Sequence, residues 1–249
     1  MRGLHGRTYL VTGAASGIGR GTTARLVEAG ANVAMVDLDG ERLAAVAASL
    51  PDGQVAPVRC DVSDDGEVAA AVAAALDRFG ALHGVVTSAG IFDLADFGDL
   101  DATDPATFQR VLSVNVTGTF LVLRAALPHL GPGGAVVTVA STAGLRGHGF
   151  GAAYTASKGG VVALTRLAAL QYGPRGVRVN CVCPGATAGE GMGATFTDPD
   201  TAAAVAADLP LRRVGTGADL GSAIAALLSD EMAYVTGQVL AVDGGATAR

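Results

Sequence analysis

Residues 11–19, VTGAASGIG, join a short apolar run to the start of a helical pattern. Gly13, Gly17 and Gly19 permit a tight turn and a close approach of the backbone to a bound group. A helix that begins directly after such a turn presents unpaired N–H groups, which attract a phosphate. The G-x-x-x-G-x-G spacing is a weak signal by itself. Its place between the first strand and the first helix favours a dinucleotide-binding loop over a structural turn.

Short apolar runs alternate with helical patterns along the whole chain. The apolar runs predict buried strands at 9–12, 32–36, 54–60, 84–87, 135–140, 177–182 and 239–242. The helical patterns cover about 18–29, 41–49, 65–79, 104–130, 152–173 and 217–229. Asp104 followed by Pro105 predicts a helix start, and Gly30, Gly80 and Gly173 stand where helices should end.

This alternation predicts an α/β fold: a single doubly wound parallel sheet (Rossmann fold) of about seven strands with helices on both faces. No linker rich in proline, serine or charge divides the 249 residues, so we expect one Rossmann domain over 1–249. Residues 185–215 are the least regular stretch. Their glycines and small side chains predict a mobile flap over a substrate.

The composition limits the possible functions. Half of the residues are apolar and the formal net charge is −6, with no basic cluster that could neutralise nucleic-acid phosphates. The sequence contains neither an uninterrupted apolar stretch of about 18 residues nor a signal-peptide pattern, so we expect a soluble, cytoplasmic protein. Three cysteines and four scattered histidines predict neither disulfides nor a metal site.

Two aspartates follow predicted strands where an adenosine would bind. Asp37 stands eighteen residues beyond Gly19, and its carboxylate can accept ribose hydroxyls and would repel a 2′-phosphate. We therefore expect NAD rather than NADP, although a strand-terminal turn aspartate is the alternative. Asp61 can approach the adenine edge, a prediction that spacing alone leaves open. The remaining candidate cofactor-binding residues of this half are Ser16 and Ile18 in the loop, Leu38 beside Asp37, and Val62 beside Asp61.

The stretch GAAYTASKGG, residues 151–160, contains the only lysine of the chain. Tyr154 and Lys158 are one helical turn apart and share a helix face. Hydride transfer from an alcohol requires a proton transfer at its oxygen, and a tyrosine of ordinary pKa, about 10, is a poor base. An ammonium about 4 Å away would favour the phenolate by about 4 kcal/mol, or about three pKa units. An exposed lysine on an ordinary helix is the alternative.

Two further polar residues stand near this pair in the predicted fold. Ser141 closes the strand at 135–140, and its hydroxyl could donate to a substrate oxygen, whereas strand alternation points Thr142 to the other face. Asn115 interrupts an apolar helix, where an asparagine is unfavourable without compensation. Its amide could hold a water near Lys158, or it could mark a local kink beside Gly118.

Taken together, these motifs resemble those of the short-chain dehydrogenases/reductases of about 250 residues, 3-oxoacyl reductases among them. TGAASGIG, CDV, VNVTG, YTASK, RVNCVCPG and YVTGQVLAVDGG occur in the order of that family. The resemblance implies Tyr154 as acid/base, Ser141 orienting the carbonyl, and Lys158 binding ribose and lowering the Tyr154 pKa. It also implies that Asn115 anchors a proton-relay water. It places Ser88, Ala89, Gly90, Pro184, Gly185 and Thr187 at the cofactor.

Two positions depart from the family pattern. Ser88 stands where the family usually has asparagine, and Gly189 stands where it often has threonine, so Thr187 or the backbone is expected to contact the carboxamide. The resemblance further implies a homotetramer or homodimer that buries the helices at 104–130 and 152–173 and the C-terminal segment.

We therefore expect an NAD(H)-dependent oxidoreductase that interconverts a secondary alcohol and a ketone. The alternatives are an NADP-linked 3-oxoacyl-type carbonyl reductase, a non-catalytic dinucleotide sensor and a Rossmann-like methyltransferase, which would not need the Tyr154–Lys158 pair. We expect His148 to donate to a substrate oxygen. The other expected substrate walls are mostly apolar and suit a neutral or weakly polar small molecule: Phe92, Ala143, Leu145, Phe150, Met192 and Phe196, with Arg146 as the one cation.

Overall fold

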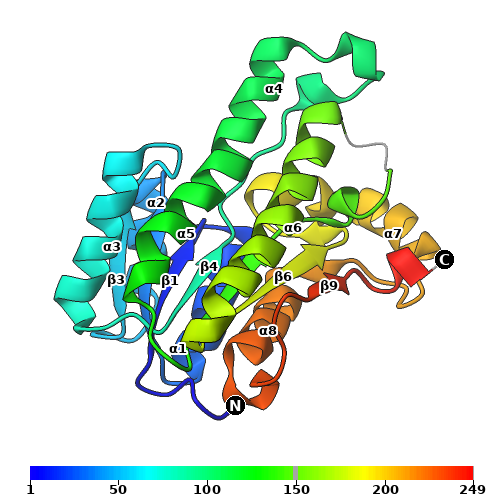
Figure 1. Ribbon diagram of the computed structural model, residues 1–249. Coiled ribbons are helices and arrows are strands. Elements are labelled where there is room, and N and C mark those ends of the chain that lie inside the picture. The colour runs from blue at the N-terminus through cyan, green and yellow to red at the C-terminus, as the bar shows by residue number, and fades with distance from the viewer. Residues whose placement is uncertain (148–150, 249) are drawn as a thin grey trace.

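The computed structural model describes residues 1–147 and 151–248, and its centre is one parallel sheet (Figure 1). Seven strands lie in the order β3-β2-β1-β4-β5-β6-β9, and every neighbouring pair is parallel. Their bounds are β1 Thr8–Thr12, β2 Asn32–Asp37, β3 Val55–Arg59, β4 Gly84–Thr87, β5 Ala135–Val139, β6 Arg178–Pro184 and β9 Val239–Val242. The predicted doubly wound fold is confirmed.

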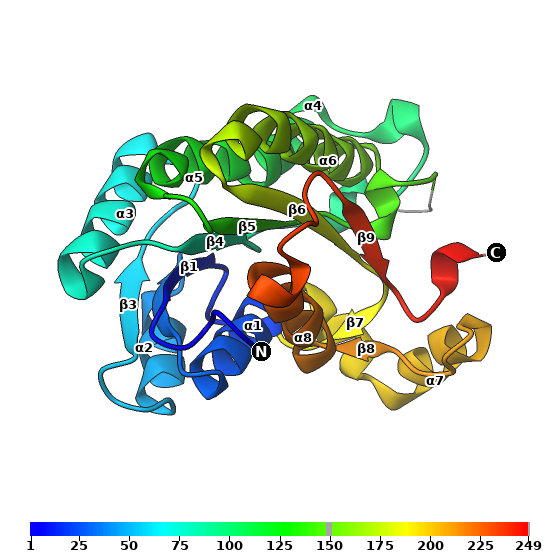
Figure 2. The same cartoon turned by 60° about the horizontal axis from the view of Figure 1, so that its bottom comes forward.

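Helices cover both faces of the sheet (Figure 2). One layer holds α1 Gly17–Glu28, α2 Gly40–Ala48 and α8 Gly217–Leu228. The other holds α3 Asp65–Phe79, α4 Pro105–Leu112, α5 Thr119–Ala126 and α6 Ala152–Tyr172. Alternate residues of β1 divide between the layers, because Leu10 packs with the α3 and α5 side whereas Tyr9 and Val11 pack with the α1 and α8 side. The sheet is therefore apolar on both faces, as a parallel sheet between two helix layers requires.

The helix predicted at 104–130 is interrupted by a π-helical turn, Ser113–Gly118, between α4 and α5. The N-cap prediction at its start is confirmed, because the Asp104 carboxylate accepts the Thr107 N–H at 3.0 Å. Among the described residues, one helical run, Pro105–His129, is long and apolar enough to cross a membrane by length and composition. Half of its most apolar window is buried inside the domain, which suits a core helix.

Residues 185–215, for which a mobile flap is predicted, contain regular elements. The flap itself stays a prediction. Strand β7, Thr187–Ala188, pairs with β8, Gly215–Thr216, and helix α7, Pro199–Asp208, lies between them. The helix starts where Asp198 accepts the Thr201 N–H at 2.9 Å and Pro199 occupies the first turn. This is the same aspartate–proline signal that predicts α4, and the run of alanines that follows it favours a helix.

Candidate active site

The glycine loop between β1 and α1 depends on residues without side chains. Gly13 and Gly17 have φ values of 69° and 48°, the region that glycine adopts at least cost. A Cβ at Gly19 would lie 2.0 Å from the Gly13 carbonyl oxygen, and one at Gly13 would lie 2.9 Å from Ala89 N. The loop therefore packs backbone against backbone, at the edge formed by the carboxyl ends of β1 and β4.

The amino terminus of α1 is open to an anion. Its N-cap, Ser16, makes no side-chain hydrogen bond to the first turn, and that turn contains no acidic residue. By contrast, aspartate or threonine side chains cap α2, α3, α4, α7 and α8. The N–H groups of α1 are therefore left for a ligand, and a pyrophosphate is the group that they and the helix dipole suit best.

Asp37 lies against the same loop. Its Oδ2 accepts the Ala15 N–H at 2.9 Å and its Oδ1 accepts the Asp39 N–H at 3.1 Å. A carboxylate has about four lone-pair sites, so both oxygens can still accept ribose hydroxyls. The following side chain, Leu38, is exposed.

At the predicted adenine side, Asp61 Oδ1 accepts both the hydroxyl and the N–H of Ser63. These hydrogen bonds lower the pKa of Asp61, so the group stays ionised. Val62 is buried and packs against Gly118, where an added Cβ would lie 2.8 Å from its Cγ2. Asp61 is thus held at the start of the loop into α3, with Val62 as its anchor in the core.

Ser88 fastens the end of β4 to the end of β1. The Thr12 hydroxyl oxygen accepts the N–H groups of Ser88 and Ala89, each at 3.1 Å, and the Ser88 hydroxyl donates to the Thr12 carbonyl. The serine that departs from the family pattern is therefore tied into the strand ends. Gly90 follows it, and a Cβ there would lie 3.1 Å from Asn115 Oδ1 and 3.3 Å from Lys158 Nζ.

The structure brings Ser141, Tyr154 and Lys158 together. The side chains of Ser141 and Tyr154 are hydrogen-bonded, and the Ser141 hydroxyl oxygen also accepts the Ala143 N–H at 3.1 Å. Lys158 is buried, donates to the Val139 carbonyl at 3.1 Å, and places its Nζ 5.6 Å from the centroid of the Tyr154 ring. The turn after Ser141 packs closely on α6, because a Cβ at Gly144 would lie 2.6 Å from the Lys158 backbone.

Burial governs the pKa values of this pair. It raises the pKa of Tyr154, and the hydrogen bond from Ser141 opposes that increase. Burial also lowers the pKa of Lys158 to about 8. Burial is the largest cause acting on the Tyr154 pKa, so the net shift in the chain by itself is upward. That Lys158 lowers this pKa stays a prediction.

Asn115 lies in the π-helical turn, and its side chain bridges two elements. Its Oδ1 accepts the Ile91 N–H at 2.8 Å, and its Nδ2 donates to the Ile91 carbonyl and to the Ser157 hydroxyl, each at 2.9 Å. The amide thus fixes the chain after β4 to α6, one residue before Lys158. The helix is distorted here, and the buried amide lies near the lysine. That the amide holds a water stays a prediction.

Cys181 and Cys183 are buried residues of β6, and they lie close to Lys158. Their sulfurs are 3.9 Å apart on one face of β6, in a cluster with Val161 and Val162 of α6. The hydrogen bond between the two thiols lowers the pKa of Cys181 to about 7 and raises that of Cys183. A thiolate at Cys181 favours the protonated form of Lys158.

The segment after β6 packs on the glycine loop. Pro184 ends β6 beside Val242, and the Thr187 hydroxyl donates to the Gly185 carbonyl at 3.0 Å. Farther along, Arg20 of α1 and Glu190 form an ion pair of 2.6 Å. The backbone lies equally close, because a Cβ at Gly17 would be 3.4 Å from the Glu190 carbonyl oxygen.

The chain matches known proteins over nearly its whole length. A family model described as enoyl-(acyl carrier protein) reductase matches residues 13–247. The 2-(R)-hydroxypropyl-CoM dehydrogenase of Xanthobacter autotrophicus is 38% identical over 97% of this chain and 99% of its own. The chain belongs to the short-chain dehydrogenase/reductase family. It is accordingly an oxidoreductase that acts on CH–OH groups, as the family resemblance implied.

Two other curated short-chain dehydrogenases/reductases show the range of names among its relatives. The cis-4-hydroxycyclohexanecarboxylate dehydrogenase of Sinomonas cyclohexanicum is 39% identical over 97% of each chain. A protein of Xanthobacter autotrophicus named inactive 2-(S)-hydroxypropyl-CoM dehydrogenase 2 is 45% identical over 89% of this chain and 97% of its own.

Solved structures of the same family match the fold over nearly the full length. Levodione reductase has a TM-score of 0.91 and 36% identity, covering 98% of both chains. A 3-ketoacyl-(acyl-carrier-protein) reductase from Brucella melitensis, solved in complex with NADH, has a TM-score of 0.89 and 32% identity, covering 98% of this chain and 99% of that one.

The substrate side of this short-chain dehydrogenase/reductase is described in part. Phe92 meets the Tyr154 ring edge to face, with centroids 6.4 Å apart. Leu145 is exposed, whereas Ala143 is buried and cannot form an open wall as predicted. Met192 and Phe196 lie on the 3₁₀ turn Gly191–Thr197. His148 and Phe150 lie outside the described residues.

Sequence reasoning missed two acidic residues near the site. Glu190 pairs with Arg20 across 170 positions, and Asp96 binds the first turn of α6 across 57 and 58 positions. Neither carboxylate lies within a local motif with its partner, so the sequence offers no signal for either contact. The polar residues predicted for the site do assemble at the carboxyl edge of the sheet, where ligands of doubly wound folds bind.

Proposed function

We propose that the chain uses NAD(H) to interconvert a secondary alcohol and a ketone, with Tyr154 as the general acid/base. The observation that carries this proposal is the hydrogen bond between Ser141 and Tyr154 above the buried Lys158. A phenol and a hydroxyl held together at the carboxyl edge of the sheet can both meet one substrate oxygen.

The glycine loop and α1 fit a dinucleotide, since the Ser16 side chain makes no hydrogen bond to the first turn of α1 and that turn has no acidic residue. Bound NAD would supply the hydride acceptor, a nicotinamide ring. Gly13, Ser16, Gly17, Ile18 and Gly19 would hold the pyrophosphate. Asp37 would accept the ribose hydroxyls, and at about 4 Å it would disfavour a 2′-phosphate charge by about 4 kcal/mol. We therefore favour NAD over NADP.

Proton transfer is the task of Tyr154. When a ketone is reduced, the phenol gives its proton to the carbonyl oxygen as hydride reaches the carbon. Burial raises the Tyr154 pKa and so favours this protonated form. When an alcohol is oxidised, the phenolate takes the hydroxyl proton as hydride leaves. Before this transfer the phenolate oxygen carries the negative charge, and the Ser141 hydroxyl and the Lys158 ammonium stabilise it.

The substrate class follows from the surroundings of Tyr154. Phe92 and Leu145 provide apolar surface, which suits a small neutral or weakly polar alcohol. One relative is named for a hydroxycyclohexane carboxylate and another for a hydroxypropyl thiol conjugate, so both ring and short-chain secondary alcohols belong in a screen. His148 remains our candidate for a donor to the substrate oxygen.

The test is a screen of such alcohols, and of the matching ketones, with NAD(H) and with NADP(H). The assay follows the absorbance of the reduced nicotinamide during turnover, first with the unmodified chain and then with Tyr154→Phe. We expect turnover with NAD by the unmodified chain alone, and equal NADH binding by both. Normal turnover by Tyr154→Phe would refute the acid/base role, and equal use of NADP would refute the cofactor preference.

A non-catalytic dinucleotide sensor is the second candidate function. The observation that favours it is the relative named as inactive, at 45% identity. The sensor predicts NADH binding with no turnover in the whole screen. The assembled Ser141, Tyr154 and Lys158 favour the enzyme, because a sensor has no need of a hydrogen-bonded phenol above a buried amine.

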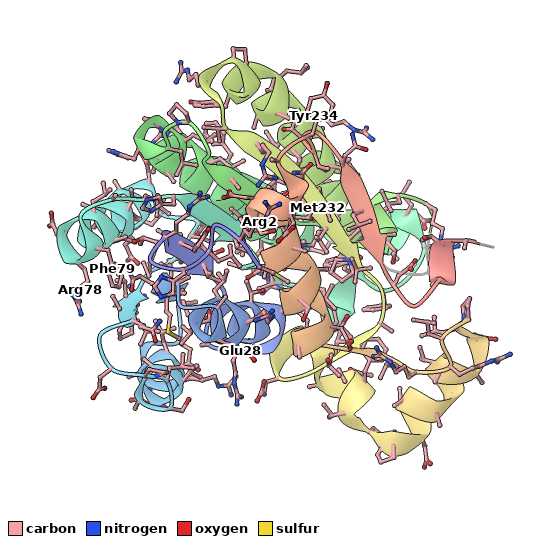
Figure 3. The ribbon with its side chains drawn as sticks, turned by 90° about the horizontal axis from the view of Figure 1, so that it is seen from below. Arg2, Glu28, Arg78, Phe79, Met232 and Tyr234 are labelled. Atoms are coloured by element: carbon pink, nitrogen blue, oxygen red, sulfur yellow. The ribbon has the colours of Figure 1, made fainter. Side chains whose placement is uncertain are left out.

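We also propose a cytoplasmic homodimer or homotetramer. Three large apolar side chains on α5 and α6 are exposed: Phe120 at 44%, Leu167 at 50% and Leu170 at 78%. Met232 and Tyr234 project from the segment between α8 and β9 (Figure 3), and Tyr234 is fully exposed. Apolar side chains gathered on adjacent helices are typical of subunit contacts.

A further inference from the structure

Helix α6 carries both Tyr154 and Lys158, yet its start lacks a cap of its own. The N-cap residue is Gly151, which has no side chain to accept an N–H of the first turn. Tyr154 is the third residue of this helix, so any fraying of the first turn would move its phenol directly. The position of the acid/base group therefore depends on what satisfies these N–H groups.

The carboxylate of Asp96 does so from a distant part of the chain. Its Oδ1 accepts the Ala153 N–H at 3.0 Å and its Oδ2 accepts the Tyr154 N–H at 2.9 Å. Thr103 donates to Oδ1 at 3.4 Å. Asp96 ends the 3₁₀ turn Leu94–Asp96 and is only 2% exposed. A buried carboxylate at a helix start is favoured both by these two N–H groups and by the helix dipole.

The contact between Asp96 and the start of α6 leaves no room for a side chain at residue 151. A Cβ at Gly151 would lie 1.8 Å from the Asp96 carbonyl oxygen and 2.2 Å from its Cγ. The same segment also touches the tyrosine ring, because Phe92 packs edge to face on Tyr154 and on Phe97, with centroids 6.4 Å and 5.9 Å apart. Residues 92–97 thus hold Tyr154 by its backbone and by its ring.

We propose that Asp96 is a positioning residue for the reaction: by binding the first turn of α6 it fixes the Tyr154 phenol against Ser141 and the substrate oxygen. This inference rests on the proposed acid/base function of Tyr154. A misplacement of about 1 Å in a reacting group can cost about 100-fold in rate. A residue that only stabilised the fold would lower the melting temperature and leave the turnover of the folded enzyme intact.

The test compares Asp96→Ala, Asp96→Asn and Gly151→Ala with matched controls. Asp104→Asn removes a carboxylate from the start of α4, where it caps Thr107 at 3.0 Å. Gly173→Ala adds a Cβ at the far end of α6, where nothing lies within 4 Å. Each variant is assayed with cyclohexane-1,2-diol, or with whichever alcohol of the screen the unmodified chain oxidises fastest. The measurements are kcat, KM, NADH affinity and melting temperature.

We expect Asp96→Ala to lower kcat by about 100-fold and Asp96→Asn by about tenfold, since the amide keeps one acceptor oxygen. Gly151→Ala should lower kcat although the carboxylate is still present, and the double variant with Asp96→Ala should be no worse than the single one. KM for NAD and the NADH affinity should stay within about twofold in all of them. Both controls should keep their kcat.

Unchanged kcat in folded Asp96→Asn and Gly151→Ala would overturn the inference, even if both melt earlier. If Asp96→Ala does not fold, these two variants decide. Tyr154→Phe in the same assay separates the two proposals. Full activity in that variant would refute the proposed function, whereas its inactivity beside fully active Asp96 variants would refute only the positioning role.

Discussion

Replacing Lys158 by methionine should stabilise the folded chain while abolishing alcohol oxidation. The lysine is 3% exposed, and burial lowers its pKa from 10.5 to about 8. At 1.36 kcal/mol per pKa unit, holding the ammonium in this position costs about 3 kcal/mol of folding free energy. Methionine has a similar length and no charge, so it removes that cost.

A smaller loss opposes this gain. The Val139 carbonyl accepts the Lys158 ammonium at 3.1 Å, and methionine leaves this acceptor without its donor, at a cost of about 1 kcal/mol. The net stabilisation is then about 2 kcal/mol. For a chain of this size, about 2 kcal/mol corresponds to an increase in melting temperature of about 4–8 °C.

The effect should depend on pH with a definite sign. Because the pKa of Lys158 in the folded chain is below its ordinary value, the unfolded chain binds more protons between about pH 8 and pH 10.5. The contribution of Lys158 to stability therefore rises with pH across this window, and the advantage of Lys158→Met should be largest below pH 8 and shrink above it.

Thermal unfolding of both proteins without dinucleotide, at about pH 7 and about pH 9.5, measures this difference. Tyr154→Phe serves as the control, because a phenol with a raised pKa stays neutral throughout this range and should give a difference independent of pH. A Lys158→Met variant that melts below the unmodified chain at about pH 7 would refute the reasoning, as would a difference that does not change with pH.

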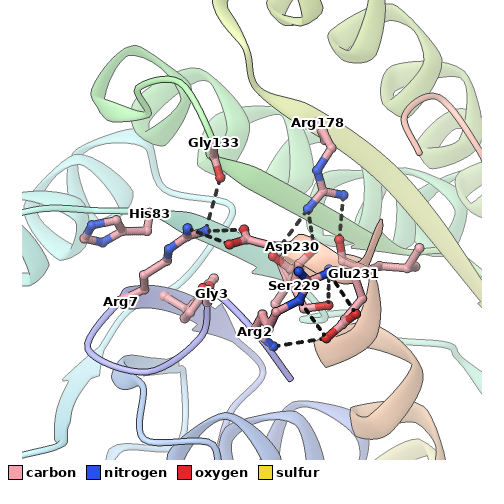
Figure 4. A network of polar contacts seen from close by, with 12 residues as sticks. Arg2, Gly3, Arg7, His83, Gly133, Arg178, Ser229, Asp230 and Glu231 are labelled. Atoms are coloured by element: carbon pink, nitrogen blue, oxygen red, sulfur yellow. Dashed lines mark hydrogen bonds and ion pairs between the residues drawn. The ribbon is translucent and has the colours of Figure 1, made fainter. Parts of the chain in front are cut away.

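Three further substitutions should each change one measurable property. Asp37→Ala should raise kcat/KM with NADP relative to NAD by at least about tenfold, measured in the same screen, because it removes the charge that faces a 2′-phosphate. Arg178→Met should lower the free energy of unfolding in urea by about 3 kcal/mol without changing the kcat of the folded enzyme. The guanidinium donates to four carbonyls around the end of α8, at 2.7–3.4 Å, at the sheet edge opposite the site (Figure 4). Leu170→Asp should convert the proposed oligomer to smaller species in light scattering, because its side chain is 78% exposed on α6.

The fold could be predicted because its signals are local. Apolar runs and the glycines between them gave the order of strands and helices, and the structure shifts their ends by a few residues. The π-helical turn Ser113–Gly118 was not predicted as such, because the apolar pattern of residues 104–130 runs through it without a proline. Helix α7 was missed for another reason: an alanine-rich amphipathic pattern is weak, although Asp198 and Pro199 marked its start.

The site was predictable where partners are near in sequence or share a sheet edge. Tyr154 and Lys158 are one turn apart, and Ser141 ends β5, so geometry brings them together once the fold is known. The direction of the Tyr154 pKa shift was not predictable, because the sequence does not show the burial that raises this pKa. The partner of Ser88 was not predictable either, because its hydroxyl donates to Thr12 of a strand 76 positions away.

The helices at the proposed site differ from the others in how the N–H groups of their first turns are satisfied. In the described part of the chain, five α-helices have an N-cap residue whose side chain accepts an N–H of the first turn, such as Asp64 of α3 and Thr216 of α8. These helices serve the fold. The π-helical turn leads into α5, so that helix has no free start. The two remaining helices face the reaction: α1 leaves its N–H groups open, as an anion requires, and α6 takes its cap from Asp96. A cap from another part of the chain couples the acid/base helix to the wall of the substrate site. A substrate that displaces residues 92–97 would therefore displace Tyr154 as well, which would link substrate fit to the proposed proton transfer.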